Sequence, residues 1–257
     1  MTDYSSRYTD SFLATEGTSY DRAISSSFEL GIWELEKHFL GEILKNCSPG
    51  PARYLDFACG TGRIISHVGQ YIEDRTGLDT SEQMIEVARK RVSSRFVVGN
   101  IIEDVTLLEG ESFDLITCFR LFLNIEPYNR RLILDALGRY LADDGYLVLN
   151  NHMNRYSVLG ITAFLLRRLR ILPSRVEAAR GRRGIIGTMS ELEFRRLLAG
   201  SGYQVQRVYR FALLPGYRSL IVLPHSLLLR VELLLSRIPI LNLFGKDQIY
   251  VCRKKSS

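Results

Sequence analysis

The sequence has few of the residues that build zinc sites and disulfide frameworks. Its four cysteines, Cys47, Cys59, Cys118 and Cys252, lie far apart and form no Cys-x-x-Cys pair. Neither a cysteine-based zinc site nor dense disulfide pairing is therefore expected, and a reducing, cytoplasmic location is the default. No run of about 18 uninterrupted apolar residues occurs, and residues 1–10 lack the pattern of a secretory signal. The expectation is a chain without a spanning helix.

The rest of the composition is that of an ordinary globular protein. The chain has 257 residues, of which 46% are hydrophobic and 24% are charged. These values exclude a disordered chain. The length suits one large domain or one domain with sizeable insertions.

Positive charge is concentrated in one stretch. Residues 167–183 contain seven arginines and one acid, Glu177, so this stretch alone accounts for the net charge of +6. Such a stretch can be a solvated face, can bind an anionic acceptor such as a phosphorylated sugar or a lipid-linked intermediate, or can rest on acidic membrane headgroups. Nucleic acid is less favoured as a partner, because no aromatic residues are interleaved with these arginines.

The stretch from Tyr54 to Arg63 predicts a strand, a tight turn and the start of a helix. A short apolar run contains Asp56, and the small residues of Ala58-Cys59-Gly60-Thr61-Gly62 follow it. Glycines allow positive φ and let a ligand lie close to the backbone. Strand, glycine turn and helix in this order form the nucleotide-binding corner of open α/β sheets. The alternative is a loop that only turns the chain.

Further strand ends follow at regular intervals and several finish in a polar residue. Asp79 ends the run 76–79, 17 residues after Gly62, and this spacing suits an acid that binds ribose hydroxyls. Asn100 ends the run 96–100. Two more apolar runs, 113–119 and 145–150, predict a fourth and a fifth strand.

From residue 54 to residue 151 this series resembles the class I S-adenosylmethionine-dependent methyltransferases. The resemblance implies an α/β fold, doubly wound around a mostly parallel seven-stranded sheet. It divides the chain into an arm with cap helices, residues 1–50, and a cofactor-binding catalytic domain, residues 51–257. In the family the glycine turn holds the methionine part of the cofactor, the second acid binds the ribose and the third polar residue meets the adenine. The resemblance thus assigns roles to Asp56, Gly60 and Gly62, to Asp79, and to Asn100.

Two positions depart from the family pattern. Ala58 stands at the first small position of the turn, where the family has Gly, and Asn100 stands where Asp is frequent. An amide can still donate to or accept from adenine. The turn lacks the third glycine of the dinucleotide fingerprint, since Arg63 follows Gly62 directly, which disfavours a nicotinamide cofactor. The resemblance adds these neighbours to the expected cofactor site: Arg63, Thr80, Met84, Ile101, Cys118 and Phe119.

The N-terminal part predicts a helix over residues 28–44. In the family such helices fold over the cofactor, and an aromatic residue near position 20 lies by its carboxylate, which makes Tyr20 a cofactor-binding candidate. For Trp33 a place in the core is favoured. Capping-box spacing predicts helix starts at Thr80-Ser81-Glu82-Gln83 and at residues 189–193, and Pro127 predicts another helix start.

Candidate catalytic residues come from the loops after the fourth and fifth strands. Residues 119–127 leave the sheet beside the reacting methyl group in the family. They lack the Asn/Asp-Pro-Pro-Tyr/Phe signature of many family members that methylate amino groups of nucleic acids or of protein glutamine. Arg120 and Asn124 are candidate contacts to substrate or cofactor. His152 is the candidate general base because histidine titrates near neutrality; the alternative is a hydrogen-bonded loop histidine. The other three histidines are expected to be structural: His38, His67 and His225.

Two insertions, 153–188 and 215–246, interrupt the expected sheet and are the predicted substrate lid. They are expected to leave the sheet at the same edge as the ligand crevice. The first predicts a helix over 158–172 that becomes basic from Arg167 onward. The second predicts an apolar helix over 223–238, which must be buried in the domain, in a subunit interface or against lipid.

The expected function is methyl transfer from S-adenosylmethionine, with S-adenosylhomocysteine as product, to oxygen on a small-molecule, glycan or lipid-linked acceptor. Three alternatives remain open: a non-catalytic S-adenosylmethionine-binding module, a peripheral membrane-associated module, and a nicotinamide or nucleotide-sugar enzyme. The oligomeric state is open as well.

Overall fold

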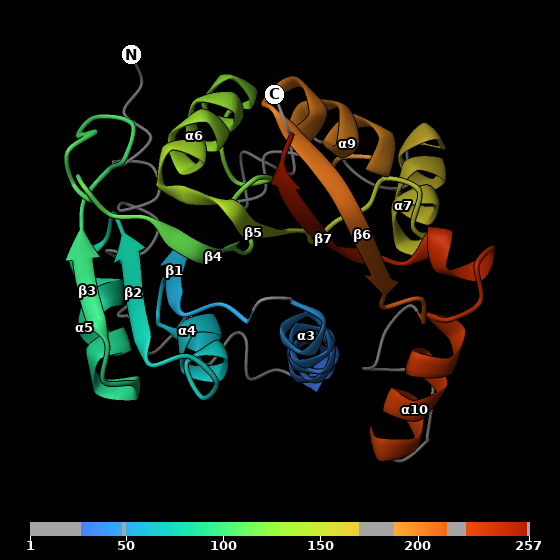
Figure 1. The fold of residues 1–257 in the computed structure, drawn as a ribbon. Helices are drawn as coiled ribbons and strands as arrows, with labels where there is room; N and C mark the ends of the chain where they lie inside the picture. Colours follow the sequence, from blue (N-terminus) through green and yellow to red (C-terminus); the bar gives the residue numbers. More distant parts are fainter. Residues whose placement is uncertain (1–26, 48–49, 170–187, 215–224, 256–257) are drawn as a thin grey trace.

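The structure is a computed structural model and describes residues 27–47, 50–169, 188–214 and 225–255. A seven-stranded sheet runs through its centre in the order β3-β2-β1-β4-β5-β7-β6 (Figure 1). The strands are β1 (Arg53–Phe57), β2 (Asp74–Asp79), β3 (Arg95–Val98), β4 (Phe113–Cys118), β5 (Leu141–Asn151), β6 (Tyr203–Phe211) and β7 (Asp247–Lys254).

The sheet is mostly parallel. Neighbouring strands from β3 through β5 pair in parallel, and β7 pairs antiparallel to both β5 and β6. All strands except β7 therefore end at the same edge, where doubly wound sheets bind their ligands. The predicted α/β class and seven-stranded sheet are confirmed.

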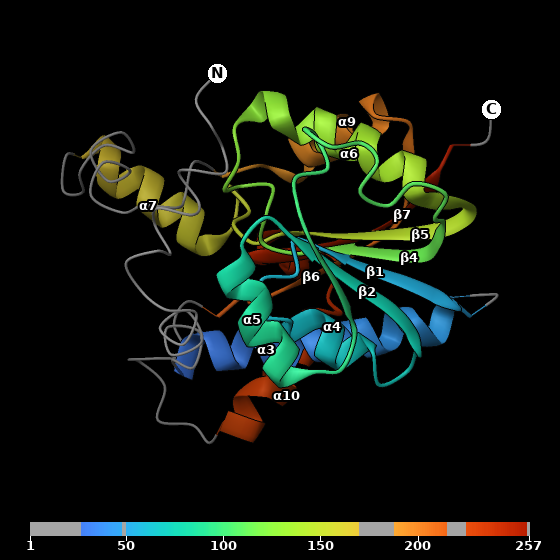
Figure 2. The ribbon, with the colours of Figure 1, turned by 90° about the vertical axis from the view of Figure 1, so that its left-hand side faces the viewer.

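Helices cover both faces of the sheet (Figures 1 and 2). On one face lie α6 and α9, and on the other lie α3, α4 and α5. The helices are α3 (Ser27–Asn46), α4 (Arg63–Val68), α5 (Glu82–Arg91), α6 (Pro127–Tyr140), α7 (Val158–Arg168), α9 (Glu191–Gly200) and α10 (His225–Leu235), with the short 3₁₀ helix η1 (Leu241–Phe244).

The apolar core consists of two clusters separated by the sheet. Leu147 and Leu149 of β5 belong to the cluster on the α6 side, whereas Val148 between them belongs to the cluster on the α3 side. This alternation follows from the two-residue period of a strand. Helix α3 contributes Leu35 and Leu40 to its cluster, and burying one such side chain stabilises the fold by roughly 1.5–3 kcal/mol. The predicted N-terminal helix is thus part of the core around the sheet.

Helix starts test the capping predictions. Ser190 and Glu193 form the expected capping box, and Pro127 is the first residue of α6. The prediction at Thr80 was wrong by one residue. Ser81 is the N-cap of α5, because Asp79 accepts a hydrogen bond from the Ser81 N–H and the Ser81 hydroxyl accepts one from Met84 N.

Element ends differ in places from the sequence-based expectation. Strand β6 ends at Phe211, where Ala212 takes positive φ (60°) and its carbonyl accepts a hydrogen bond from Lys246 N. The helix predicted over 158–172 is found as α7, and the part beyond residue 169 lies outside the described residues. The helix predicted over 223–238 is found as α10. Both insertions begin at the carboxyl edge of the sheet, after β5 and β6.

In the described part of the chain, no helix combines the length and the apolar character needed to cross a membrane.

Candidate functional site

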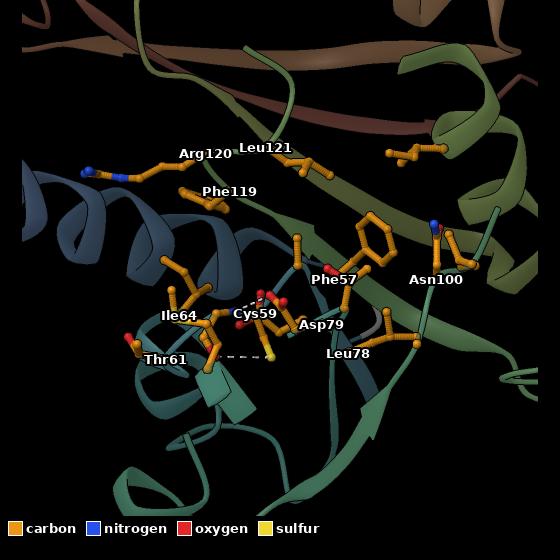
Figure 3. Close-up of a pocket in the computed structure, with 18 of the residues that line it drawn as sticks. Phe57, Cys59, Thr61, Ile64, Leu78, Asp79, Asn100, Phe119, Arg120 and Leu121 are labelled. Atoms are coloured by element: carbon orange, nitrogen blue, oxygen red, sulfur yellow. Dashed lines mark hydrogen bonds between the residues drawn. The ribbon is translucent and has the colours of Figure 1, made fainter. Parts of the chain in front are cut away.

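A pocket opens at the carboxyl ends of β1, β2 and β4 (Figure 3). It holds about 930 Å³ of empty space, counting its open mouth. Most of the residues predicted for the site line it: Asp56, Ala58, Gly60, Arg63, Asp79, Thr80, Met84, Asn100, Ile101, Phe119 and Arg120. Segments far apart in the sequence thus meet at one place, as the strand-end pattern predicted.

The remaining predicted residues lie elsewhere. Gly62, Cys118, Asn124 and His152 are not among the residues that line the pocket. The thiol of Cys118 is fully buried and belongs to the apolar cluster on the α6 side. Tyr20 lies outside the described residues.

Asp79 ends β2 as a buried carboxylate held by backbone donors. Its Oδ2 accepts from Gly60 N at 2.8 Å and its Oδ1 from Ser81 N at 3.0 Å. Burial raises the pKa of this carboxyl above its usual value, and the backbone hydrogen bonds act against that rise. The two carboxylate oxygens have about four lone-pair directions in all, so the backbone donors do not use the full capacity of the carboxylate to accept hydrogen bonds.

Asp56 anchors the turn to the helix that follows it. Its Oδ2 accepts from Ile65 N of α4 at 3.0 Å, and its Oδ1 accepts from the Thr117 hydroxyl at 2.8 Å. The Thr117 hydroxyl is in turn 2.7 Å from the Tyr54 hydroxyl. Burial raises the pKa of Asp56 to about 7, although both hydrogen bonds favour the charged form. The acid therefore titrates in the physiological range.

The glycine turn uses positive φ at three positions. Ala58, Gly60 and Gly62 have φ of 56°, 51° and 74°. A Cβ at Gly60 would meet nothing within 4 Å, so the space above it is open to a ligand. A Cβ at Gly62 would lie 2.9 Å from the Cβ of Ala88, so this glycine lets α4 pack against α5. Ala58, which replaces a family glycine, adopts the left-handed conformation that costs other residues roughly 1–2 kcal/mol.

Asn100 and Ile101 form the far wall of the pocket, after β3. The Asn100 Oδ1 accepts from Ile102 N at 3.1 Å, which directs the amide NH₂ group to a ligand. Ile101 is 1% exposed, and Met84 of α5 is 3% exposed. Met84, expected in the cofactor site, lines the pocket and is buried.

Glu36 is a site residue that the sequence reading missed. It lies on α3, is fully buried, and its carboxylate is 3.5 Å from the Arg63 guanidinium and 3.3 Å from that of Arg120. Both arginines line the pocket, and in Figure 3 the Arg120 side chain extends toward α3. The sequence could have indicated this position. Glu36 is one helical turn from the apolar residues Ile32 and Leu40, and so it lies on the face of α3 that packs against the core.

Trp33, expected in the core, is half-buried beside the same cluster. The Arg63 guanidinium lies 4.6 Å from its ring centroid, and the His67 ring meets it edge-on at 5.8 Å. A cation over an aromatic face is attracted by the ring quadrupole. Trp33 therefore helps to hold Arg63 in place at the pocket.

Arg120 has a strained backbone that its neighbours hold in place. Its φ is 58°, its N–H donates to Asn150 Oδ1 at 2.6 Å, and its carbonyl accepts from Asn124 Nδ2 at 2.6 Å. Backbone strain of this kind is found at functional sites. Asn124 is thus placed to position Arg120 rather than to line the pocket.

His152 directly follows β5, within reach of the charges of Arg120 and Lys246. Burial, together with the positive charges of Arg120 and Lys246, lowers the pKa of His152 to about 3. Within the part of the chain described, its buried Nδ1 has no hydrogen-bond partner, and neither has Oδ1 of the neighbouring buried Asp247. Asp247 pairs with Lys246 at 3.1 Å, and burial raises the pKa of Asp247 to about 6. His152 is therefore a neutral imidazole at physiological pH.

Comparison with known proteins finds relatives for the region that contains this site. Residues 55–145 match the family model described as "Methyltransferase domain". The chain is 36% identical over 103 residues to demethylmenaquinone methyltransferase of Thermotoga maritima, and 32% identical over 113 residues to dTDP-3-amino-3,6-dideoxy-α-D-glucopyranose N,N-dimethyltransferase of Streptomyces fradiae. These matches cover 38% and 42% of this chain and 43% of each relative.

A solved structure shares the fold over nearly the whole length. Magnesium protoporphyrin IX methyltransferase from Synechocystis, with bound S-adenosylhomocysteine, aligns with a TM-score of 0.66 over 96% of this chain and 98% of that one, at 14% identity. The matched residues 55–145 contain the glycine turn, Asp79 and Asn100. Residues 55–145 therefore match a methyltransferase domain, and the chain shares the fold of a solved S-adenosylmethionine-dependent methyltransferase.

Proposed function

We propose that this protein transfers the methyl group of S-adenosylmethionine to an oxygen atom of a small-molecule, glycan or lipid-linked acceptor. The observation that carries the proposal is Asp79, a buried carboxylate that lines the pocket and whose capacity to accept hydrogen bonds is not filled by its backbone donors. Two adjacent ribose hydroxyls are the ligand that such a carboxylate fits.

The other residues of the pocket fit the remaining parts of the cofactor. The NH₂ group of Asn100 and the side chain of Ile101 suit the edge and the face of adenine. The open space above Gly60 admits the chain that carries the sulfonium. S-adenosylmethionine supplies the activated methyl group when bound. The protein then has to hold the acceptor about 3–3.5 Å from that methyl and exclude water.

His152, which does not line the pocket, is our candidate for orienting an acceptor hydroxyl. It is neutral at physiological pH, and its Nδ1 is buried without a partner in the described residues, so it can accept a hydrogen bond from an acceptor hydroxyl. Its low pKa makes it a weak base, so its main contribution is to orient the hydroxyl.

An amino group is the second candidate acceptor. The Streptomyces fradiae relative is named as an N,N-dimethyltransferase of an amino sugar. A neutral amine needs no base before it attacks, so His152 would then be dispensable. A non-catalytic S-adenosylmethionine-binding module is the remaining alternative. It would bind the cofactor, but no acceptor would reach the methyl group.

Isothermal titration tests the cofactor first. The purified protein is titrated with S-adenosylmethionine, S-adenosylhomocysteine and the nicotinamide dinucleotides. Binding of the first two alone supports the proposal and justifies a screen of hydroxylated and amino acceptors with S-adenosylhomocysteine release as readout. Binding of a nicotinamide dinucleotide, or of none of these compounds, would overturn it.

Replacing His152 separates the two acceptor classes. With an acceptor found in the screen, we expect His152→Ala to lower turnover at least tenfold and to leave the affinity for S-adenosylmethionine unchanged. His38→Ala, on the outer side of α3, is the matched control. Equal turnover of the two variants would remove His152 from the reaction and favour an amino acceptor.

A further inference from the structure

Exposed apolar side chains gather in two short segments. Among the described residues, eighteen large apolar side chains are exposed, and thirteen of them lie in residues 156–169 and 234–244. Phe164 and Leu169 are 60% and 67% exposed, and Ile240 of the second segment is 73% exposed. Single exposed apolar side chains are ordinary, but a concentration of this kind marks an interaction site.

The two segments are fastened to each other. Asn154, just before α7, is buried, and its Nδ2 donates to the carbonyls of Leu243 and Gly245, each at 3.0 Å. Its backbone N–H donates to Lys246 O at 2.8 Å. Figure 1 accordingly shows α7 beside the turn that joins α10 to β7. We call residues 156–169 and 234–244 together the apolar surface.

The charge of the apolar surface has one sign. Neither segment contains an aspartate or a glutamate. Arg168 and Arg237 are exposed on them. The surface therefore offers apolar side chains together with positive charge and no acid to pair with it.

This composition favours one of the two partners that could cover the apolar surface, a second copy of the chain or a lipid bilayer. If two copies met symmetrically through the surface, both copies of Arg168 and Arg237 would lie in an interface whose two segments supply no acid to pair with them, which is unfavourable. An anionic bilayer matches both features of the surface. Its hydrocarbon layer can bury the apolar side chains, and its negative headgroups attract the arginines, with a gain of about 1 kcal/mol for each arginine.

We propose that the apolar surface docks this protein on the face of an anionic lipid bilayer. Docking is peripheral, because no described helix could span the bilayer. Helix α7 starts seven residues after the end of β5, at the sheet edge where the pocket opens. Docking would therefore bring that edge of the protein near the lipid. The binding step itself does not depend on the proposed methyl transfer.

Vesicle flotation of the full chain tests the proposal. We expect flotation with vesicles of phosphatidylcholine mixed with phosphatidylglycerol, little flotation with phosphatidylcholine alone, and release at high salt, since salt screens the arginines. Each of Phe164→Ser and Ile240→Ser should lower partitioning about tenfold, since each removes a side chain that the bilayer would bury.

Matched variants keep the test falsifiable. Leu192→Ser, at a position 56% exposed on α9 outside the apolar surface, should float like the wild type. Thermal unfolding checks that all three variants remain folded. Absence of flotation with anionic vesicles, or equal flotation of Phe164→Ser, Ile240→Ser and wild type, would overturn the proposal. So would a dimer in solution that these two substitutions dissociate, because a second copy would then be the occupant.

Discussion

Asp79 is a buried carboxylate whose two oxygens are only partly used by the protein. If the cofactor ribose takes the remaining lone pairs, Asp79→Ala removes two charge-assisted hydrogen bonds, each worth about 1.5–3 kcal/mol. We expect the affinity for S-adenosylmethionine to fall at least 100-fold in calorimetry. Asp74→Ala, at the exposed opposite end of β2, is the control and should bind like the wild type. Unchanged binding by Asp79→Ala would remove the basis of the cofactor assignment.

Asp56 gives the stability of the protein a pH dependence of known sign. Its pKa is raised to about 7, whereas an unfolded aspartate titrates near about 4. The folded state thus binds more protons between these values, and this contribution to stability is lost as the pH rises through that window.

We therefore compare wild type with Asp56→Asn, which cannot titrate. Between about pH 5 and pH 7, the free energy of unfolding of the wild type should fall relative to that of the variant by up to about 1.4 kcal/mol per pH unit. Urea denaturation at successive pH values measures this difference. Parallel curves for the two proteins would contradict a raised pKa.

At the scale of elements, the packing of α4 against α5 depends on Gly62. An added Cβ would face Ala88 at 2.9 Å on a backbone with φ of 74°. We expect Gly62→Ala to lower the free energy of unfolding by about 2–4 kcal/mol, from backbone strain and overpacking together. Gly60→Ala shares the positive φ but meets nothing within 4 Å, so it should cost about 1–2 kcal/mol. Equal losses in urea denaturation would show that helix packing is not the cause.

At the scale of the whole molecule, Glu36 joins the N-terminal helix to two loops of the sheet. Glu36→Gln leaves Arg63 and Arg120 without this carboxylate, and we expect a loss of about 2–3 kcal/mol in the free energy of unfolding. The cofactor affinity should fall as well, because both arginines line the pocket. Glu34→Gln on the same helix removes only a half-exposed pair with Lys37 and should cost under about 1 kcal/mol. If both variants lost a similar free energy of unfolding, the contacts of Glu36 with Arg63 and Arg120 would not contribute to the stability of the fold.

Much of the site could be predicted because its residues end strands. Asp56, Asp79 and Asn100 each follow an apolar run, and parallel strands bring their carboxyl ends to one edge. The fold and the composition of the pocket follow from that local pattern. The exact cap of α5 did not follow, because Asp79 takes the Ser81 N–H and moves the helix start by one residue.

What the sequence by itself determined was the order of strands and turns, since hydrophobic period and glycine placement are local properties of the chain. What only the tertiary structure decided was which distant residues meet. Glu36 reaches Arg120 across 84 positions, and His152 lies near Lys246 because β7 pairs antiparallel with β5. The same holds for the apolar surface, since a run such as 234–244 is compatible with burial or exposure until its neighbours are in place. Such contacts depend on how layers of helices and strands pack, which no local pattern encodes.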